Sequence, residues 1–115
     1  MPKLIYTPKA LDDLQGIKTY VSKQFGGDRA KICAREIATT VRQLEMFPDE
    51  GPCLQDLIEY PTDYHYLVVK PNYILYRIEG DTVRVIRILN EKQDFLQILF
   101  GISSISEEGK NYWGD

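Results

Sequence analysis

The sequence predicts an α+β fold: an N-terminal β-strand, then an antiparallel helix hairpin packed on an antiparallel β-meander, then a short C-terminal helix. Two observations carry this prediction. Residues 7–47 contain two apolar stripes with helical spacing, joined by only two glycines. Residues 64–90 contain three apolar segments separated by tight-turn sequences. A chain of 115 residues suits one core of two packed layers, so we expect a single domain over residues 1–101 and a tail over residues 102–115.

The first elements are a short strand and two helices. Leu4 to Tyr6 is the strand candidate, and Thr7-Pro8 supplies a helix N-cap followed by proline at the first helical position. The first helix stops at Gly26-Gly27. Asp28 is expected to cap the second helix, which Phe47-Pro48 ends because proline cannot continue it. The apolar stripes consist of Ala10, Leu14, Ile17, Val21 and Phe25 in the first helix and Ala30, Ala34, Ile37, Val41 and Leu44 in the second.

The meander must cover both stripes. Two long helices joined by two residues lie antiparallel, and each needs an apolar surface to pack on. We expect the three strands of the meander at residues 64–69, 73–78 and 82–89, with turns at Pro71-Asn72 and Glu79-Gly80-Asp81. Regular alternation along the third of these strands places Val83, Val85, Arg87 and Leu89 on one face and Arg84, Ile86, Ile88 and Asn90 on the other.

The other segments are an acidic loop, a closing helix and the tail. Residues 48–63 contain three prolines and five carboxylates, which predicts a loop with a single helical turn at Leu54 to Ile58. Lys92 to Phe100 is expected to form a short helix that Gly101 ends. The tail has no periodicity, and both a frayed end and a docked strand remain open for it.

Charge and composition limit the classes of function. The net charge of −3 and the pI of about 5.2 argue against a protein that depends on binding phosphates. No apolar segment approaches the roughly 20 residues of a membrane helix, and residues 1–13 lack a signal-peptide stretch, so we expect a cytoplasmic protein. Cys33 and Cys53 form no CxxC motif and the chain has one histidine, so we predict no metal and no cofactor.

Basic and aromatic residues are the candidates for chemistry. The chain has no GxSxG elbow and no glycine-rich phosphate loop between a strand and a helix. Metal-free cleavage of RNA needs a base for the 2′-hydroxyl, cations at the phosphate and a proton donor. If the chain is a nuclease, its catalytic candidates are His65, Arg77, Arg87 and Lys92. The alternative is structural: His65 is a structural or surface residue, and each arginine pairs with a nearby acid. Glu79, Glu91 and Asp94 are such acids.

The meander also resembles a known family. Residues 72–95 read NYILYRIEGDTVRVIRILNEKQDF, and this form resembles the C-terminal half of the RelE/ParE family, the toxins of bacterial toxin–antitoxin pairs. The resemblance covers roughly residues 3–101. It implies that the first strand joins the sheet at an edge, that the helix hairpin packs on one face, and that a cognate antitoxin neutralises the chain.

Two branches of the family differ in mechanism. RelE-like toxins cleave mRNA on translating ribosomes and have arginine after the tyrosine of the second meander strand, where this chain has Ile74 after Tyr73. The lysines that this branch places on the preceding strand are missing from HYLVV, residues 65–69. The segment YILYR looks more like the ParE branch, which poisons DNA gyrase. We therefore favour a gyrase inhibitor, with a ribosome-dependent endoribonuclease and an inactive toxin-fold binding protein as alternatives.

An antitoxin is the expected partner, and we expect it to bind between the hairpin and the sheet. Three meander strands leave part of two long apolar stripes uncovered, and exposed apolar surface commonly marks a binding site. The oligomeric state stays open, a homodimer included. Candidate antitoxin contacts are Leu11, Leu14, Val41, Tyr73 and Arg84.

Overall fold

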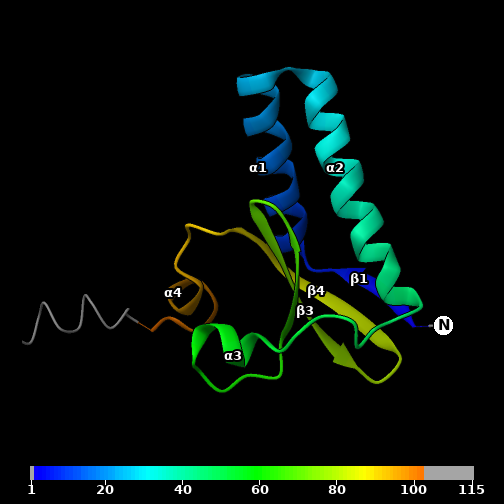
Figure 1. Cartoon of the computed structure of the whole chain (residues 1–115), viewed down its shortest axis with the longest axis vertical. Helices are drawn as coiled ribbons and strands as arrows, with labels where there is room; N and C mark the ends of the chain where they lie inside the picture. The colour runs from blue at the N-terminus through cyan, green and yellow to red at the C-terminus, as the bar shows by residue number, and fades with distance from the viewer. Residues whose placement is uncertain (1, 103–115) are drawn as a thin grey trace, which may run out of the picture.

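The computed structural model describes residues 2–102, and its elements follow the predicted order (Figure 1). The α+β class and the type of every predicted element are confirmed. The division into a domain and a tail stays a prediction, because residues 103–115 lie outside the described part. The elements are β1 (Lys3–Tyr6), α1 (Pro8–Phe25), α2 (Gly27–Arg42), the 3-10 turn η1 (Gln43–Glu45), α3 (Leu54–Ile58), β2 (His65–Val69), β3 (Asn72–Glu79), β4 (Thr82–Asn90) and α4 (Phe95–Phe100).

The four strands form one sheet in the order β1-β4-β3-β2. β3 pairs antiparallel with both β2 and β4, as expected for a meander. β1 pairs parallel with β4 and lies at the edge of the sheet, where the family resemblance placed it. β4 is therefore a central strand, although it is the last strand within residues 2–102.

A β-bulge in β4 breaks the alternation that the sequence predicted. Val85 lies opposite Tyr76 and Arg87 lies opposite Leu75, so Ile86 is an extra residue without its own partner on β3. Val85 and Ile88 consequently join the same core cluster. The prediction that they face opposite sides was wrong, because one inserted residue reverses the parity of every residue after it.

The second helix differs from prediction at both ends. α2 begins at Gly27, and Gly26, with a φ of 97°, is its N-cap; Asp28 is a first-turn residue and not the cap. Glycine suits this position because other residues adopt a positive φ only with strain. α2 ends at Arg42 and continues as the single 3-10 turn η1, so the predicted end at Phe47 was slightly too late.

The last helix starts later than predicted. α4 begins at Phe95 and not at Lys92, because Asp94 is its N-cap and accepts the Gln97 N–H at 3.1 Å. Gly101 ends the helix in the left-handed conformation, as predicted.

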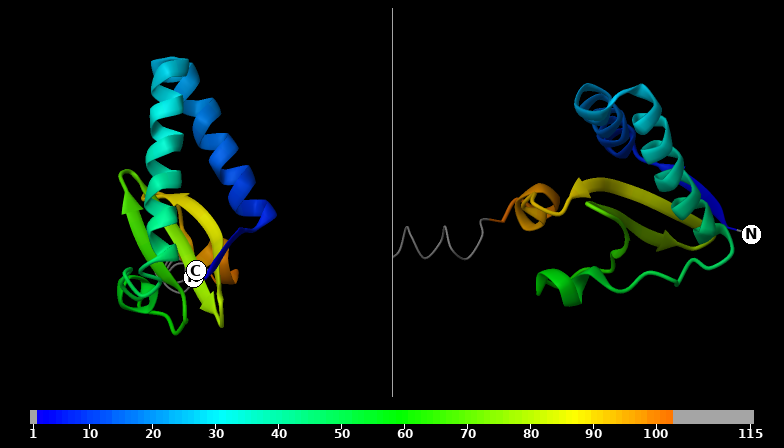
Figure 2. Two further views of the ribbon diagram at one scale, coloured as in Figure 1. Left: turned by 90° about the vertical axis from the view of Figure 1, so that its right-hand side faces the viewer. Right: turned by 45° about the horizontal axis from the view of Figure 1, so that its top comes forward.

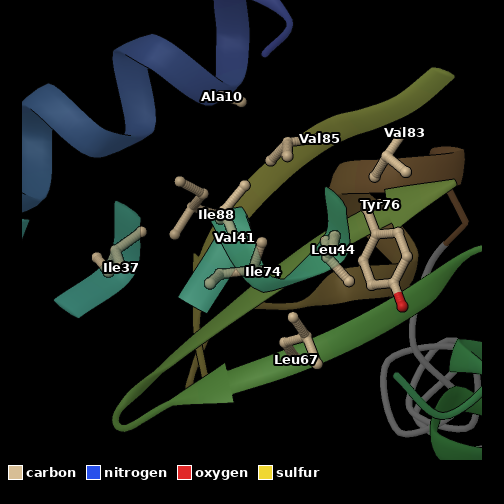
Figure 3. Close-up of a cluster of buried hydrophobic side chains, with 10 residues drawn as sticks. All are labelled: Ala10, Ile37, Val41, Leu44, Leu67, Ile74, Tyr76, Val83, Val85 and Ile88. Atoms are coloured by element: carbon tan, nitrogen blue, oxygen red, sulfur yellow. The ribbon is translucent and has the colours of Figure 1, made fainter. Parts of the chain in front are cut away.

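The helix hairpin covers one face of the sheet over only part of its own length (Figures 1 and 2). Its end around Gly26 projects beyond the sheet. Tyr20, Phe25 and Ile32 in this projecting part are 62%, 70% and 44% exposed. Figure 3 shows the core cluster under the covered part, formed by Ala10, Ile37, Val41, Leu44, Leu67, Ile74, Tyr76, Val83, Val85 and Ile88.

A second, smaller cluster lies on the opposite face of the sheet. It contains Leu54, Leu75, Leu89 and Phe95, with α3 and α4 supplying the cover. The acidic loop reaches this region by adding to the edge of β2: the Leu54 N–H donates to the Tyr64 carbonyl at 2.8 Å. Within residues 2–102 no helix has the length and apolar character needed to cross a membrane.

Candidate functional site

A groove of about 460 Å³ lies where α1 leaves the sheet. One wall comes from the helices, and the other from the β2–β3 turn and the end of β4. The first wall is apolar because the stripe of α1 continues beyond the sheet with no strand beneath it. Polar side chains also line the groove: Asp12, Asp13, Asn72, Asn90 and Gln93. The apolar residues that line the groove are Ile17, Tyr20, Val21, Phe25, Cys33, Pro71 and Ile88.

Asp13 links α1 to β4 through its side chain. Its two carboxylate oxygens accept from Arg87 Nε at 2.7 Å and Nη2 at 2.9 Å, and Oδ2 also accepts the Ile88 N–H at 2.9 Å. The two side chains are only 14% and 19% exposed, and the hydrogen bond to Asp13 raises the pKa of Arg87. Bidentate pairing at low exposure is the strong form of this interaction. No local pattern in the sequence indicates Asp13, and the predicted partners of Arg87 were acids closer in sequence.

The four candidate nuclease residues do not meet at one point. The His65 ring stacks on Tyr76 with centroids 5.4 Å apart, and its Nδ1 lies 3.0 Å from the Gly51 carbonyl oxygen. Arg77 alternates with the core residue Tyr76 along β3, so it lies on the opposite face of the sheet. There it pairs with Asp63 at 3.0 Å. Arg87 is held by α1, as described.

The fourth candidate, Lys92, is exposed in the turn after β4 and pairs with no acid among residues 2–102. Phosphate chemistry needs several cations around one oxygen cluster, and these side chains do not provide it in this conformation. In the same described range, no group of three or more His, Cys, Asp or Glu side chains is placed to hold a metal ion.

Comparison with known proteins identifies the family. The family model described as the ParE toxin of a type II toxin-antitoxin system, parDE, matches residues 4–95. The chain belongs to the ParE toxin family. A solved structure titled "Chromosomal ParDE TA system from P. aeruginosa" has the same fold, with a TM-score of 0.68 and 24% sequence identity over 78% of this chain and 96% of that one. No curated protein matches the sequence. The inferred resemblance to RelE/ParE toxins, nearer the ParE branch, is confirmed.

The residues named as antitoxin contacts are spread over the ParE fold and do not line the groove. Val41 has no exposed surface, because it packs in the core between the hairpin and the sheet. In this conformation a partner cannot contact its side chain. Leu14 packs against the same core, and Leu11 is 52% exposed. Tyr73 belongs to the second cluster on the far face of the sheet, and Arg84 pairs with Glu79 at 3.0 Å, one of the acids predicted from sequence.

The signal for the groove residues was present in the sequence. Ile17, Val21 and Phe25 belong to the predicted stripe of the first helix. The end of the hairpin where α1 meets α2 projects beyond the sheet (Figure 1). The end of the stripe that the sheet cannot reach was the better candidate for an exposed surface than its middle.

Proposed function

We propose that this ParE-family chain inhibits DNA gyrase and is neutralised by a cognate antitoxin that binds the groove between α1 and the β2–β3 turn. One observation carries the proposal for the antitoxin: Tyr20 and Phe25 line the groove, yet they are 62% and 70% exposed. Large aromatic side chains gathered at one exposed apolar groove are typical of a protein-binding surface.

The groove suits an amphipathic helix. Its apolar wall repeats along α1 at Ile17, Val21 and Phe25, a spacing that a partner helix matches with its own residues at three- and four-residue intervals. Asp12 lines the groove, is exposed, and favours a basic residue on the polar side of the partner. The bound helix would extend the core cluster into the projecting half of the hairpin.

The arrangement of the basic residues supports gyrase over mRNA as the target. Removing one well-placed donor from a transition state costs about 3 kcal/mol, or roughly a hundredfold in rate. This chain lacks an arginine after Tyr73, and its His65, Arg77 and Arg87 each contact a different protein group. The ParE branch, to which the chain is closer, acts by binding gyrase and needs no such cation cluster.

Co-expression with the product of the neighbouring gene tests the antitoxin. We expect the two proteins to co-purify, and Phe25→Gln to weaken their complex at least about tenfold, the equivalent of 1.4 kcal/mol. Phe47→Gln is the matched control, because Phe47 is 59% exposed but lies two residues after η1 and outside the groove. Equal loss in the two variants, or no loss in either, would assign the antitoxin to another surface.

Two assays on the purified toxin test the target. We expect inhibition of gyrase supercoiling or accumulation of its cleaved DNA complex. We expect no cuts when primer extension is run on mRNA bound to translating ribosomes. Discrete cuts in the ribosomal A site, abolished by Lys92→Ala, would support the RelE-like alternative. A chain that binds its antitoxin but is inert in both assays would be the inactive toxin-fold protein.

A further inference from the structure

The projecting half of the hairpin carries a charge opposite to that of the whole chain. Residues 15–35 contain five basic side chains and one acidic side chain, a net charge of +4, whereas the chain has −3. The other described residues contain eight basic and thirteen acidic side chains, a net charge of −5. The basic residues of the projecting half are Lys18, Lys23, Arg29, Lys31 and Arg35.

These five cations are exposed, and none forms an ion pair with another residue in the range 2–102. The arginines of the sheet behave differently, because Arg77, Arg84 and Arg87 all pair with carboxylates. The basic character of the hairpin therefore remains available to a partner, whereas that of the sheet is largely neutralised within the chain.

Three of the lysines surround a second groove, which we call the outer groove. It has a volume of about 420 Å³ and is lined only by α1 and α2, with no residue from the sheet. It shares no lining residue with the groove proposed for the antitoxin. Lys18, Lys23 and Lys31 lie around it, and its other lining residues are small or polar, among them Thr19, Ser22 and Ala30.

We propose that the outer groove binds an acidic segment of a partner protein, with carboxylates placed against Lys18, Lys23 and Lys31. The small residues allow a peptide backbone to approach the two helices, and the lysines supply flexible cations around it. The proposal does not depend on the identity of the toxin's target.

The charge distribution favours a short acidic segment over nucleic acid. Screening limits the reach of exposed charges to about 8–10 Å at physiological salt, so a short ligand in the outer groove interacts mainly with the projecting half. A long duplex carries negative charge well beyond that distance and would meet the acidic remainder of the molecule. Exposed ion pairs are individually weak, so several carboxylates are needed and binding will be sensitive to salt.

Fluorescence anisotropy with a fluorescein-labelled hexaglutamate peptide tests this on the full chain. We expect saturable binding in 50 mM NaCl that weakens about fivefold or more in 200 mM NaCl. The triple variant Lys18→Glu, Lys23→Glu, Lys31→Glu should lose at least about tenfold in affinity. The matched triple variant Lys3→Glu, Lys9→Glu, Lys70→Glu has the same net charge and should stay within about twofold of the parent. In the parent, amide chemical-shift changes should centre on Thr19, Ser22 and Ala30.

Three results would overturn the proposal. Undetectable binding of hexaglutamate would show that the outer groove is not an acidic-peptide site, and equal loss in both triple variants would mean that only net charge matters. Tighter binding of a 20-base-pair DNA duplex than of the peptide would identify a nucleic-acid surface. Circular dichroism checks that each variant folds; if the glutamate triple does not, the corresponding glutamine triple replaces it, with an expected loss of about fivefold.

Discussion

The two halves of the helix hairpin have the same sequence pattern and different surroundings. In the half over the sheet, Ala10, Ile37, Val41 and Leu44 have no exposed surface. In the projecting half, Ala30 is the buried member of the two stripes, and Phe25 at the same spacing is 70% exposed. Periodicity thus identifies the side of a helix that is apolar, whereas the position of the sheet beneath the helix decides how much of that side is covered. The covered half stabilises the fold, and the projecting half presents binding surface.

The largest expected effect is in the covered half. Leu44→Ala should lower the free energy of unfolding by about 2–5 kcal/mol, because the side chain is fully buried and its removal leaves a cavity. Val21→Ala, in the groove, should cost less than about 1 kcal/mol, since Val21 is only half-buried. Urea denaturation of both variants measures the difference. Equal costs would mean that the projecting half is as tightly packed as the covered half.

The next effect is at the boundary between the halves. Asp13→Ala should cost about 1–3 kcal/mol, because it leaves the Arg87 guanidinium and the Ile88 N–H without their acceptor in a mostly buried place. Asp13→Asn keeps one carbonyl acceptor and should lose less. The same denaturation experiment checks the order. An alanine variant as stable as the parent would show that Asp13 does not fix the hairpin on the sheet.

The third effect is expected at Tyr76, whose hydroxyl links the covered side of the sheet to the acidic loop. The Tyr76 hydroxyl donates to the Pro48 carbonyl at 3.1 Å and accepts the Gly51 N–H at 2.9 Å. Tyr76→Phe removes both hydrogen bonds and should cost about 1–2 kcal/mol at neutral pH, measured by urea denaturation.

The stability that the Tyr76 hydroxyl contributes should also depend on pH. Burial raises the pKa of Tyr76 above its ordinary value of 10.0, so the folded state favours the protonated hydroxyl. The Tyr76 hydroxyl therefore makes its full contribution to the free energy of unfolding below pH 10. This contribution is lost as the pH rises through the raised pKa. Unfolding free energies at pH 9 and above should fall more steeply for the parent than for Tyr76→Phe. Parallel curves would contradict this account.

The smallest effect on stability is expected in the projecting half. Phe25→Gln and Phe47→Gln should each change the free energy of unfolding by no more than about 0.5 kcal/mol, because both side chains are mostly exposed. The two variants should differ only in antitoxin binding. A large destabilisation by Phe25→Gln would mean that the groove is part of the folding core.

Local signals in the sequence were sufficient for most of the fold. Thr7 caps α1 by accepting the Ala10 N–H at 3.1 Å, and the glycine at 101 ends α4, both as predicted from residue type. The strands and their turns likewise follow from apolar segments and turn residues that are adjacent in sequence. The family resemblance added the edge position of β1, which no local pattern indicates.

Non-local contacts could not be predicted in the same way. Asp13 and Arg87 are 74 positions apart, and nothing near either residue distinguishes this pairing from others. Which part of the hairpin is exposed depends on where the sheet lies beneath it. The sequence therefore predicted a groove but not the residues that line it. The four basic candidates are all predicted to lie on or beside the sheet, yet the two faces of the sheet separate Arg77 from His65.

The bulge at Ile86 has a consequence for comparing this chain with its relatives. The β3 partners of Val85 and Arg87 are consecutive residues, Tyr76 and Leu75, so a chain without Ile86 would keep the same pairing. A relative that lacks the bulge would be one residue shorter inside a central strand, where sequence alignments rarely place a gap. Moving that gap to the turn at Gly80 would shift the strand by one residue and assign its core positions to the wrong face.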